Sequence, residues 1–548
     1  MCKNYLENLV GVVADGQYQI KMFSKNLREK LSIADDDAEL LPISWDAAHF
    51  LNLVITDVRD DEVHGLYLRR FIKRANLFAH LFGRGRGHAA LEAASETGAC
   101  AISVFAVQRF ASSAIKQWDA IASSYLELHN AFRAENPNCV DNEELQYQLF
   151  GSDFVFDLCC LLDLMEPIRR LMEIVQDLKL PHWKIAVLWP KVSDFLSQRA
   201  EEFCLDDYPC LKESYDNVRP GGMYKGVPLL EGWLVESQKA GGPVDWRVRE
   251  QKDMEADVVS FACALHWSFN QRIAKCMGEA GADCVILDAP SIVRLLGEEN
   301  REEFVEEYTH SAAATRLVDL AARHENLRSS LNVKLARKYI ASYVAAFHES
   351  FLSGVGRDNW LTPAVSGPIT DVKVTQATRS RCDFRLHLMV TTQSGDRIAT
   401  VLNEQAVYQS FYSDPKIFRV ASPSACLLLD FGLHRSGSEA IVETFYATMR
   451  SQQQQGGQHN DTLQRRAKLR WMLPPVGSIA LERLLDSAAR LFYAGDRKHG
   501  LRPHRGPFFV DARATRYDVS KVVDRRRNLT SQCPFVGRAE MPGSQVDE

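Results

Sequence analysis

The sequence lacks any cysteine pattern that would organise a disulfide framework or a zinc site. Its thirteen cysteines are scattered along 548 residues, and no Cys-x-x-Cys pair occurs anywhere. Structural zinc sites usually take cysteines or histidines at short, paired spacings, and disulfide-rich domains take an even, regularly spaced set. The pattern therefore excludes a zinc finger and a disulfide-stapled secreted domain. A reducing, intracellular environment fits best.

Long hydrophobic runs, a secretion signal and a strong excess of one charge are missing as well. The longest apolar run extends from Leu158 to Leu164 and is interrupted by Asp163. A membrane-spanning helix needs about 20 apolar residues, so we expect no membrane association. The formal net charge is −6. Nucleic-acid binding, if present, must therefore come from local basic patches and not from overall charge.

The chain does contain ample apolar material, arranged mostly with helical spacing. Hydrophobic residues make up 46% and charged residues 25%, as in ordinary globular proteins, and the length exceeds one domain. The glycine-rich basic tract Gly83–His88 predicts a flexible loop, and Pro167 predicts a kink or division of its helix. Helical patterns are expected in the following segments: 44–135, 153–179, 258–277, 302–324 and 333–351.

Two regions depart from the helical period. The apolar, β-branched run Leu9–Ala14 stops at Asp15-Gly16, which predicts a buried strand followed by a turn. Polar and apolar residues alternate in 371–375, 383–388 and 397–402, with a turn at 393–396, which predicts a β-hairpin. We therefore expect an α/β fold that is predominantly helical.

Four short sequences, in a fixed order, carry the candidate chemistry. An aspartate at a strand end and a glutamate on a helix suit two-metal phosphoryl transfer, in which clustered carboxylates hold Mg²⁺ or Mn²⁺. Such sites draw ligands from distant parts of a chain. The four sequences are Val12 to Gly16 with Asp15, Asp46-Ala47-Ala48-His49, Gln108-Arg109-Phe110, and Ser438–Tyr446 with Glu443.

Taken in this order, the features resemble the hAT superfamily of DNA transposases. That family has a ribonuclease-H-like core interrupted by a long helical insertion, and the resemblance implies the same fold here. A strand-end aspartate is followed in the family by a Cys/Asp-x-x-His motif, which Asp46 to His49 matches in its Asp form. Arg109-Phe110 is similar to the family's Arg-Trp motif, with phenylalanine in place of tryptophan.

Near the C-terminus the family has a helix of the type Ser-x-Ala-x-x-Glu-Arg-x-Phe, which bears the catalytic glutamate. Ser438–Tyr446 is similar, with Glu443 at the catalytic position and Thr444 where arginine is usual. The resemblance implies that Asp15 and Glu443 are catalytic ligands of Mg²⁺ or Mn²⁺. The ordinary alternatives are a structural turn aspartate and a surface glutamate on a helix.

The resemblance also implies DNA contacts for Asp46, His49, Arg109 and Phe110. His49 would contact the transposon end, Arg109 would contact a phosphate, and Phe110 would stack on a displaced base, because aromatic faces stabilise unpaired bases. Each residue has an alternative role inside the protein. His49 would be a core or capping histidine, and Phe110 would pack in a core.

The assignment of Asp15 decides what the resemblance implies about activity. By its distance to His49, Asp15 corresponds to the family's second catalytic aspartate, and only fourteen residues precede it. We therefore expect the first aspartate and the family's N-terminal BED-type finger to be missing, and the chain to be inactive by itself. The rival register takes Asp15 as the first aspartate and Asp46 or Asp57 as the second. It is disfavoured because Asp46 belongs to the Asp-x-x-His motif.

The expected organisation follows from this register. Residues 1–60 and 405–495 would form the two parts of an incomplete ribonuclease-H-like core, 61–404 a helical insertion containing the hairpin, and 496–548 a basic tail. Residues 496–527 hold ten Lys or Arg against four Asp. The expected partners are DNA and possible further copies of the chain, and the expected location is the nucleus. Two alternatives stay open: a domesticated non-enzymatic scaffold that binds DNA or protein, and a helical scaffold with no nucleic-acid history.

Overall fold

The structure is a computed structural model, and its two compact units are Met1–Thr444 and Phe445–Glu548. Every described residue lies in the first unit, which contains two clusters of buried apolar side chains. The described ranges are 12–14, 21–30, 43–94, 111–136, 143–177, 180–219, 221–237, 242–247, 249–357, 359–375, 384–413 and 423–433.

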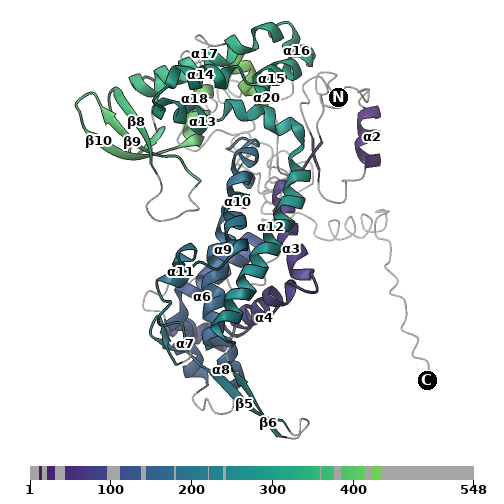
Figure 1. The fold of residues 1–548 in the computed structure, drawn as a ribbon, viewed down its shortest axis with the longest axis vertical. Coiled ribbons are helices and arrows are strands. Elements are labelled where there is room, and N and C mark those ends of the chain that lie inside the picture. The colour runs from purple at the N-terminus through teal and green to yellow at the C-terminus, as the bar shows by residue number, and fades with distance from the viewer. Residues whose placement is uncertain are drawn as a thin grey trace, which may run out of the picture. The chain divides into compact units, whose positions relative to one another are not determined.

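The first elements are two short parallel strands. β1 (Val12–Ala14) pairs with β2 (Ile43–Trp45), with Ala14 opposite Trp45, and α2 (Lys21–Lys30) lies between them in the sequence (Figure 1). Parallel neighbours require a crossover connection, and the segment that contains α2 provides it. The predicted strand is thus confirmed for its last three residues. Asp15 and Gly16 lie outside the described residues.

The first apolar cluster is built from helices around α9 (Ser152–Gln176), which is buried along most of its length. The aromatic rings of Phe71 and Phe78 both stack on Phe154, with centroids 5.4 and 5.6 Å apart. α9 continues through Pro167 as one helix instead of dividing there, because both halves pack against neighbours. The surrounding helices are α3 (Ala47–Asp60), α4 (Gly65–Phe82), α5 (Arg86–Ala94), α6 (Ala111–Ser123), α7 (Tyr125–Glu135), α8 (Glu143–Phe150), α10 (Lys184–Glu201) and α11 (Pro209–Lys212).

A long helix and several short elements complete this region. α12 (Gln251–Ala282) packs along α3 and α10, and Arg272 on α12 forms a two-pronged ion pair with Asp57 on α3 at 2.6 and 2.7 Å. The helix expected at 258–277 is therefore confirmed and longer. The short elements are η5 (Leu205–Asp207) and two antiparallel pairs, β3 (Met223–Tyr224) with β4 (Val227–Pro228), and β5 (Gly232–Ser237) with β6 (Gly242–Arg247).

The turn between α4 and α5 replaces the flexible loop expected at Gly83–His88. Gly83 ends α4, and α5 begins at Arg86. Gly85 has a positive φ of 75°, which glycine adopts without strain. A Cβ on Gly87 would lie 1.9 Å from the carbonyl oxygen of Leu81, so only glycine lets the two helices approach this closely. The two glycines make a tight corner in place of a loop.

The second apolar cluster contains the remaining helices. The helix expected at 302–324 is two helices, α14 (Arg301–Thr309) and α15 (Ala312–Arg323), because the Thr309 hydroxyl bonds the carbonyl of Glu306 and the chain turns before Ala312. The elements are η6 (Asp283–Leu287), α13 (Ala289–Arg294), η7 (Leu295–Gly297), α14 (Arg301–Thr309), α15 (Ala312–Arg323), α16 (Glu325–Arg328), η8 (Val333–Leu335), α17 (Ala336–Ser353), α18 (Glu404–Ser413) and α20 (Pro423–Leu433).

A four-stranded antiparallel sheet packs on these helices (Figure 1). Its strands are β7 (Leu361–Thr362), β8 (Ile369–Thr375), β9 (His387–Thr392) and β10 (Arg397–Leu402), in the order β7-β10-β9-β8. The predicted hairpin is confirmed for β9 and β10, with the turn at 393–396, although β9 begins later than expected. β8 and β7 extend the hairpin to a sheet with one face in the second cluster.

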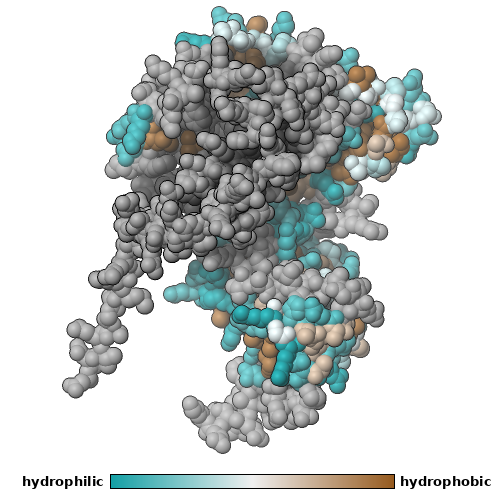
Figure 2. Space-filling view, turned by 180° about the vertical axis from the view of Figure 1, so that it is seen from behind, coloured by the Kyte–Doolittle hydropathy of each residue, from teal (hydrophilic) through white to brown (hydrophobic). Residues whose placement is uncertain are grey.

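The described residues thus form a predominantly helical α/β fold with small sheets, as expected. The antiparallel sheets outnumber the single parallel pair β1–β2 among them. Among these residues, no helix has both the length and the apolar content that a bilayer crossing requires. On the face that Figure 2 shows, the described hydrophilic and hydrophobic side chains are intermixed. The ribonuclease-H-like core and the boundaries at 60/61, 404/405 and 495/496 stay predictions.

Candidate functional site

The Asp46-x-x-His49 motif lies where β2 passes into α3. The Asp46 carboxylate accepts a hydrogen bond of 3.0 Å from the amide of Ala48, and its carbonyl accepts the first helical bond from Phe50. Asp46 is therefore the N-cap of α3, where an acidic side chain also offsets the positive end of the helix dipole. It is only 9% exposed. His49 follows on the first turn, half-buried, with its ring edge-on to that of Phe50.

The two parallel strands point their carboxyl ends toward the same edge of the sheet. Asp46 follows β2 directly at that edge, and Asp15 follows β1 in the sequence. Asp15, Arg109, Phe110 and Glu443 all lie outside the described residues. Of the predicted site residues, the structure thus describes Asp46 and His49 and brings them together at one helix start.

Asp57, the other aspartate of the rival register, has a structural contact. Both of its oxygens bind Arg272, and one also accepts a hydrogen bond of 3.2 Å from Ser268. These contacts fasten α3 to α12. Within the ranges that the structure describes, no group of three or more His, Cys, Asp or Glu side chains could hold a metal ion.

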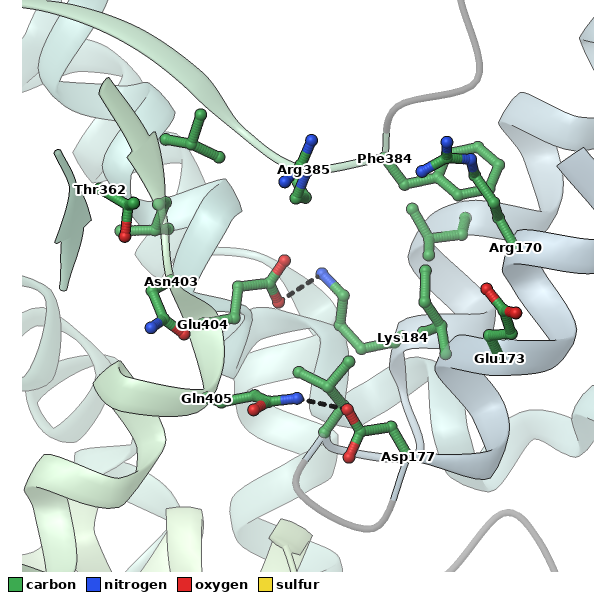
Figure 3. A pocket seen from close by; sticks show the side chains of 15 residues that line it. Arg170, Glu173, Asp177, Lys184, Thr362, Phe384, Arg385, Asn403, Glu404 and Gln405 are labelled. Atoms are coloured by element: carbon green, nitrogen blue, oxygen red, sulfur yellow. Dashed lines mark hydrogen bonds and ion pairs between the residues drawn. The ribbon is translucent and has the colours of Figure 1, made fainter. Parts of the chain in front are cut away.

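A cavity that the sequence did not indicate lies between the end of α9, the start of α10 and the sheet (Figure 3). Its volume is about 530 Å³. Apolar side chains such as Leu188 and Val401 form part of the wall, and charged or polar side chains form the rest. The polar lining residues are Arg170, Glu173, Asp177, Lys184, Thr362, Arg385, Asn403, Glu404 and Gln405.

A buried ammonium group shared by two carboxylates forms the floor of this cavity. The Lys184 Nζ lies 3.0 Å from Asp288 Oδ1 and 2.8 Å from Glu404 Oε2. The side chains of Lys184 and Asp288 are 4% and 0% exposed. Burial disfavours the charged lysine, but the two carboxylates outweigh it and hold the Lys184 pKa above its usual value. Burial raises the pKa of Glu404, and repulsion by the Asp288 carboxylate adds to the rise, which the Lys184 ammonium only partly offsets.

The Asp288 carboxylate also caps a helix. Its second oxygen accepts hydrogen bonds from the amide and hydroxyl of Ser291, at 3.2 and 2.7 Å, and so caps α13. Glu404 has the corresponding position in the first turn of α18. Both carboxylates therefore belong to helix N-termini, and Lys184 at the start of α10 lies between them.

Charges on the rim of the cavity are largely compensated by neighbours. Arg170 contacts Glu166 at 2.6 Å, Glu173 accepts from Arg169 and Lys116, and Asp177 accepts a hydrogen bond from Gln405 (Figure 3). The cavity offers room for a small polar molecule. The described lining residues include no cysteine, histidine or serine. No spacing of residues in the sequence could have predicted this cavity, because its walls come from segments far apart in the chain.

No protein-family model matches the chain, and no curated protein or solved structure is significantly similar to it.

Proposed function

We propose that this chain derives from a hAT-type DNA transposase and binds DNA, the activity of the intact parent being metal-dependent cleavage and strand transfer at transposon ends. In this proposal Asp15 and Glu443 hold Mg²⁺ or Mn²⁺, because carboxylate oxygens are the preferred ligands of these ions. Asp46, His49, Arg109 and Phe110 contact DNA. The chain acts in the nucleus, and copies of it can associate.

One observation carries the proposal: the order of elements around β1 and β2. A strand is followed in the sequence by Asp15, a helix intervenes, and a parallel strand is followed by Asp46 and His49. A long helical region then begins at once with α3. This is the order that the resemblance implies when Asp15 corresponds to the second aspartate. It supports that register over the one that uses Asp57.

Two glutamates compete for the C-terminal role, and both lie outside the described residues. Glu443 is followed by Thr444, where the family's motif has arginine. Glu482 lies in Ser478-Ile479-Ala480-Leu481-Glu482-Arg483 and keeps the Glu-Arg pair. The second sequence spaces serine and glutamate one residue closer than the first. The proposal therefore needs both positions in its test.

The test is nicking of supercoiled plasmid by the full chain with Mn²⁺, alongside fluorescence anisotropy with a labelled DNA duplex. The chain alone is expected to bind the duplex without nicking it. If it does nick, D15N should abolish the nicking and leave duplex binding within about threefold, because a lost metal ligand removes the charge stabilisation of the reaction. E443Q and E482Q would then identify the glutamate, since one should abolish any nicking and the other should not. D371N, at an exposed aspartate on β8, is the matched control and should behave as the natural chain does.

The outcomes separate the two candidate functions. Duplex binding without nicking in any metal would favour the domesticated, non-enzymatic DNA-binding protein. Nicking that survives D15N and both glutamate variants would show that these carboxylates are not the site. A chain that neither nicks nor binds duplex DNA would contradict the proposal as a whole.

A further inference from the structure

A basic surface lies at the corner between α16 and α17. The chain carries net charge −6, yet the segment from Leu327 to His348 contains four cations and no acidic residue. The cations are Arg328, Lys334, Arg337 and Lys338, and all four side chains are exposed. We call these four residues the α16–α17 patch. None of these four residues belongs to the basic stretch at 496–527.

Local hydrogen bonds hold the backbone of this corner. The Asn332 side chain accepts a bond of 3.0 Å from the Lys334 amide and so caps η8. The Asn332 amide in turn bonds the hydroxyl of Tyr339 at 3.2 Å, one turn into α17. Lys334, Arg337 and Lys338 have the three- and four-residue spacing that places side chains on one helical face. The patch is therefore presented on an ordered corner and not on a loose loop.

The patch gathers four cations that have no acidic partner, whereas several other exposed cations are paired. Exposed cations such as Arg59, Lys212 and Arg323 each form an ion pair with a nearby aspartate. In the part of the chain that the structure describes, none of the four patch residues forms an ion pair. Their combined charge is thus available to an external anion. Leu335, 42% exposed, lies among them, with Ser329 and Ser330 as further hydrogen-bond donors.

The neighbouring acidic helix limits where a polyanion can lie. α14 carries Glu302, Glu303, Glu306 and Glu307 and packs on α17. Its first residue, Arg301, contacts His348 at 3.0 Å, near the far end of α17 from the patch. A negatively charged polymer would be repelled along α14 and attracted at the α16–η8 end.

We infer that the α16–α17 patch is a docking surface for the phosphate backbone of double-stranded DNA. The inference rests on the proposed function, in which DNA is the ligand. It identifies the surface of the chain that binds this DNA. Lysine and arginine on a rigid corner bind phosphates by charge and hydrogen bonds without reading bases. Each neutralised phosphate releases counterions, so the contact should be independent of sequence and weakened by salt.

The experiment measures duplex binding by the full chain over a series of salt concentrations. The patch variant is R328Q/K334Q/R337Q/K338Q. The matched control is R84Q/R86Q/K373Q/R397Q, which removes the same charge at four exposed cations that form no ion pair among the described residues. The patch variant should bind random-sequence duplex at least tenfold more weakly. Its plot of log K against log salt should be less steep by about 3.6, from roughly 0.9 for each of four phosphate contacts.

The control should stay within about threefold of the natural chain. Circular dichroism should be unchanged in both variants, since all eight positions are exposed. Equal losses in the two variants, or no loss in the patch variant, would overturn the inference and leave DNA binding itself standing. Loss of affinity for an RNA hairpin or for phosphatidylserine vesicles, but not for DNA, would show that the partner is wrong. A natural chain that binds no duplex at low salt would overturn the proposed function as well.

Discussion

His348 lies on the inner side of α17, 3% exposed, between a cation and a carbonyl group. Its Nδ1 accepts a hydrogen bond of 3.0 Å from Arg301, because a guanidinium can only donate. Its Nε2–H therefore donates to the carbonyl of Ile292 at 2.9 Å. Burial, with a smaller contribution from the Arg301 charge, lowers the His348 pKa to about 4. The ring is neutral in the folded protein.

This histidine should make the protein less stable in mild acid. The unfolded chain takes up a proton near pH 6.5 and the folded chain only near 4, so stability is complete above 6.5 and is lost as the pH falls toward 4. The loss at pH 5 should be about 2 kcal/mol. Urea unfolding at pH 7.5 and 5.0 measures it. H348Q should lower stability at pH 7.5 but show a smaller difference between the two pH values.

The control for this prediction is H80Q, at an exposed histidine on α4, which should keep the full pH difference. An H348Q variant with the same pH dependence as the natural chain would show that another group causes the acid sensitivity.

At the scale of elements, the α4–α5 corner shows how a composition signal can mislead. The alternation of glycine and arginine in Gly83–Gly87 predicted a flexible loop, because glycine and charge are both common in loops. In the structure, the glycines instead allow a positive φ and a close contact between two helices. The same composition is compatible with a flexible loop and with this tight corner between two helices. The packing of Leu91 in the first cluster decides between them.

The G87A substitution tests this corner. Its Cβ would lie 1.9 Å from the Leu81 carbonyl oxygen, so α5 must move away from α4, and overpacking of this kind costs roughly 1–3 kcal/mol. G85A, with open space around its Cβ, should cost only about 1 kcal/mol of backbone strain. Urea unfolding compares the two variants. A G87A loss no greater than that of G85A would contradict the close contact.

At the scale of the whole molecule, Lys184 connects the two apolar clusters of the first unit. It begins α10, whose apolar residues belong to the first cluster, while Asp288 and Glu404 begin helices of the second. K184M would leave the buried carboxylates of Asp288 and Glu404 without the ammonium group that both contact. Breaking one side of a buried ion pair costs about 3–5 kcal/mol, so K184M should lower the free energy of unfolding by that amount at neutral pH.

The loss should shrink in mild acid, because protonation of a carboxylate removes one uncompensated charge. Burial already raises the pKa of Glu404, so this residue should take up the proton first. Urea unfolding at pH 7.5 and 5.5 measures both effects. K73M, at an exposed lysine on α4, should change stability by less than about 0.5 kcal/mol. Equal stability of K184M and K73M would contradict the bridging role.

Local patterns in the sequence determined most of the secondary structure of the described residues. The helix at 258–277, the strand at 397–402 and the turn at 393–396 were all predictable, because side-chain periodicity and turn residues act over a few positions. The N-cap role of Asp46 was not predicted, although an aspartate directly before a helical pattern is a known capping signal. The roles of Asp15, Arg109, Phe110 and Glu443 stay predictions.

Only the tertiary structure decided which distant residues meet. The parallel pairing of β1 with β2, the ion pair of Asp57 with Arg272, and the bridge from Lys184 to Asp288 and Glu404 join segments with no local signal for each other. A charged side chain looks the same in the sequence whether it faces solvent or a buried partner. Its partner is chosen by how the helices pack around it, and that choice depends on the whole chain.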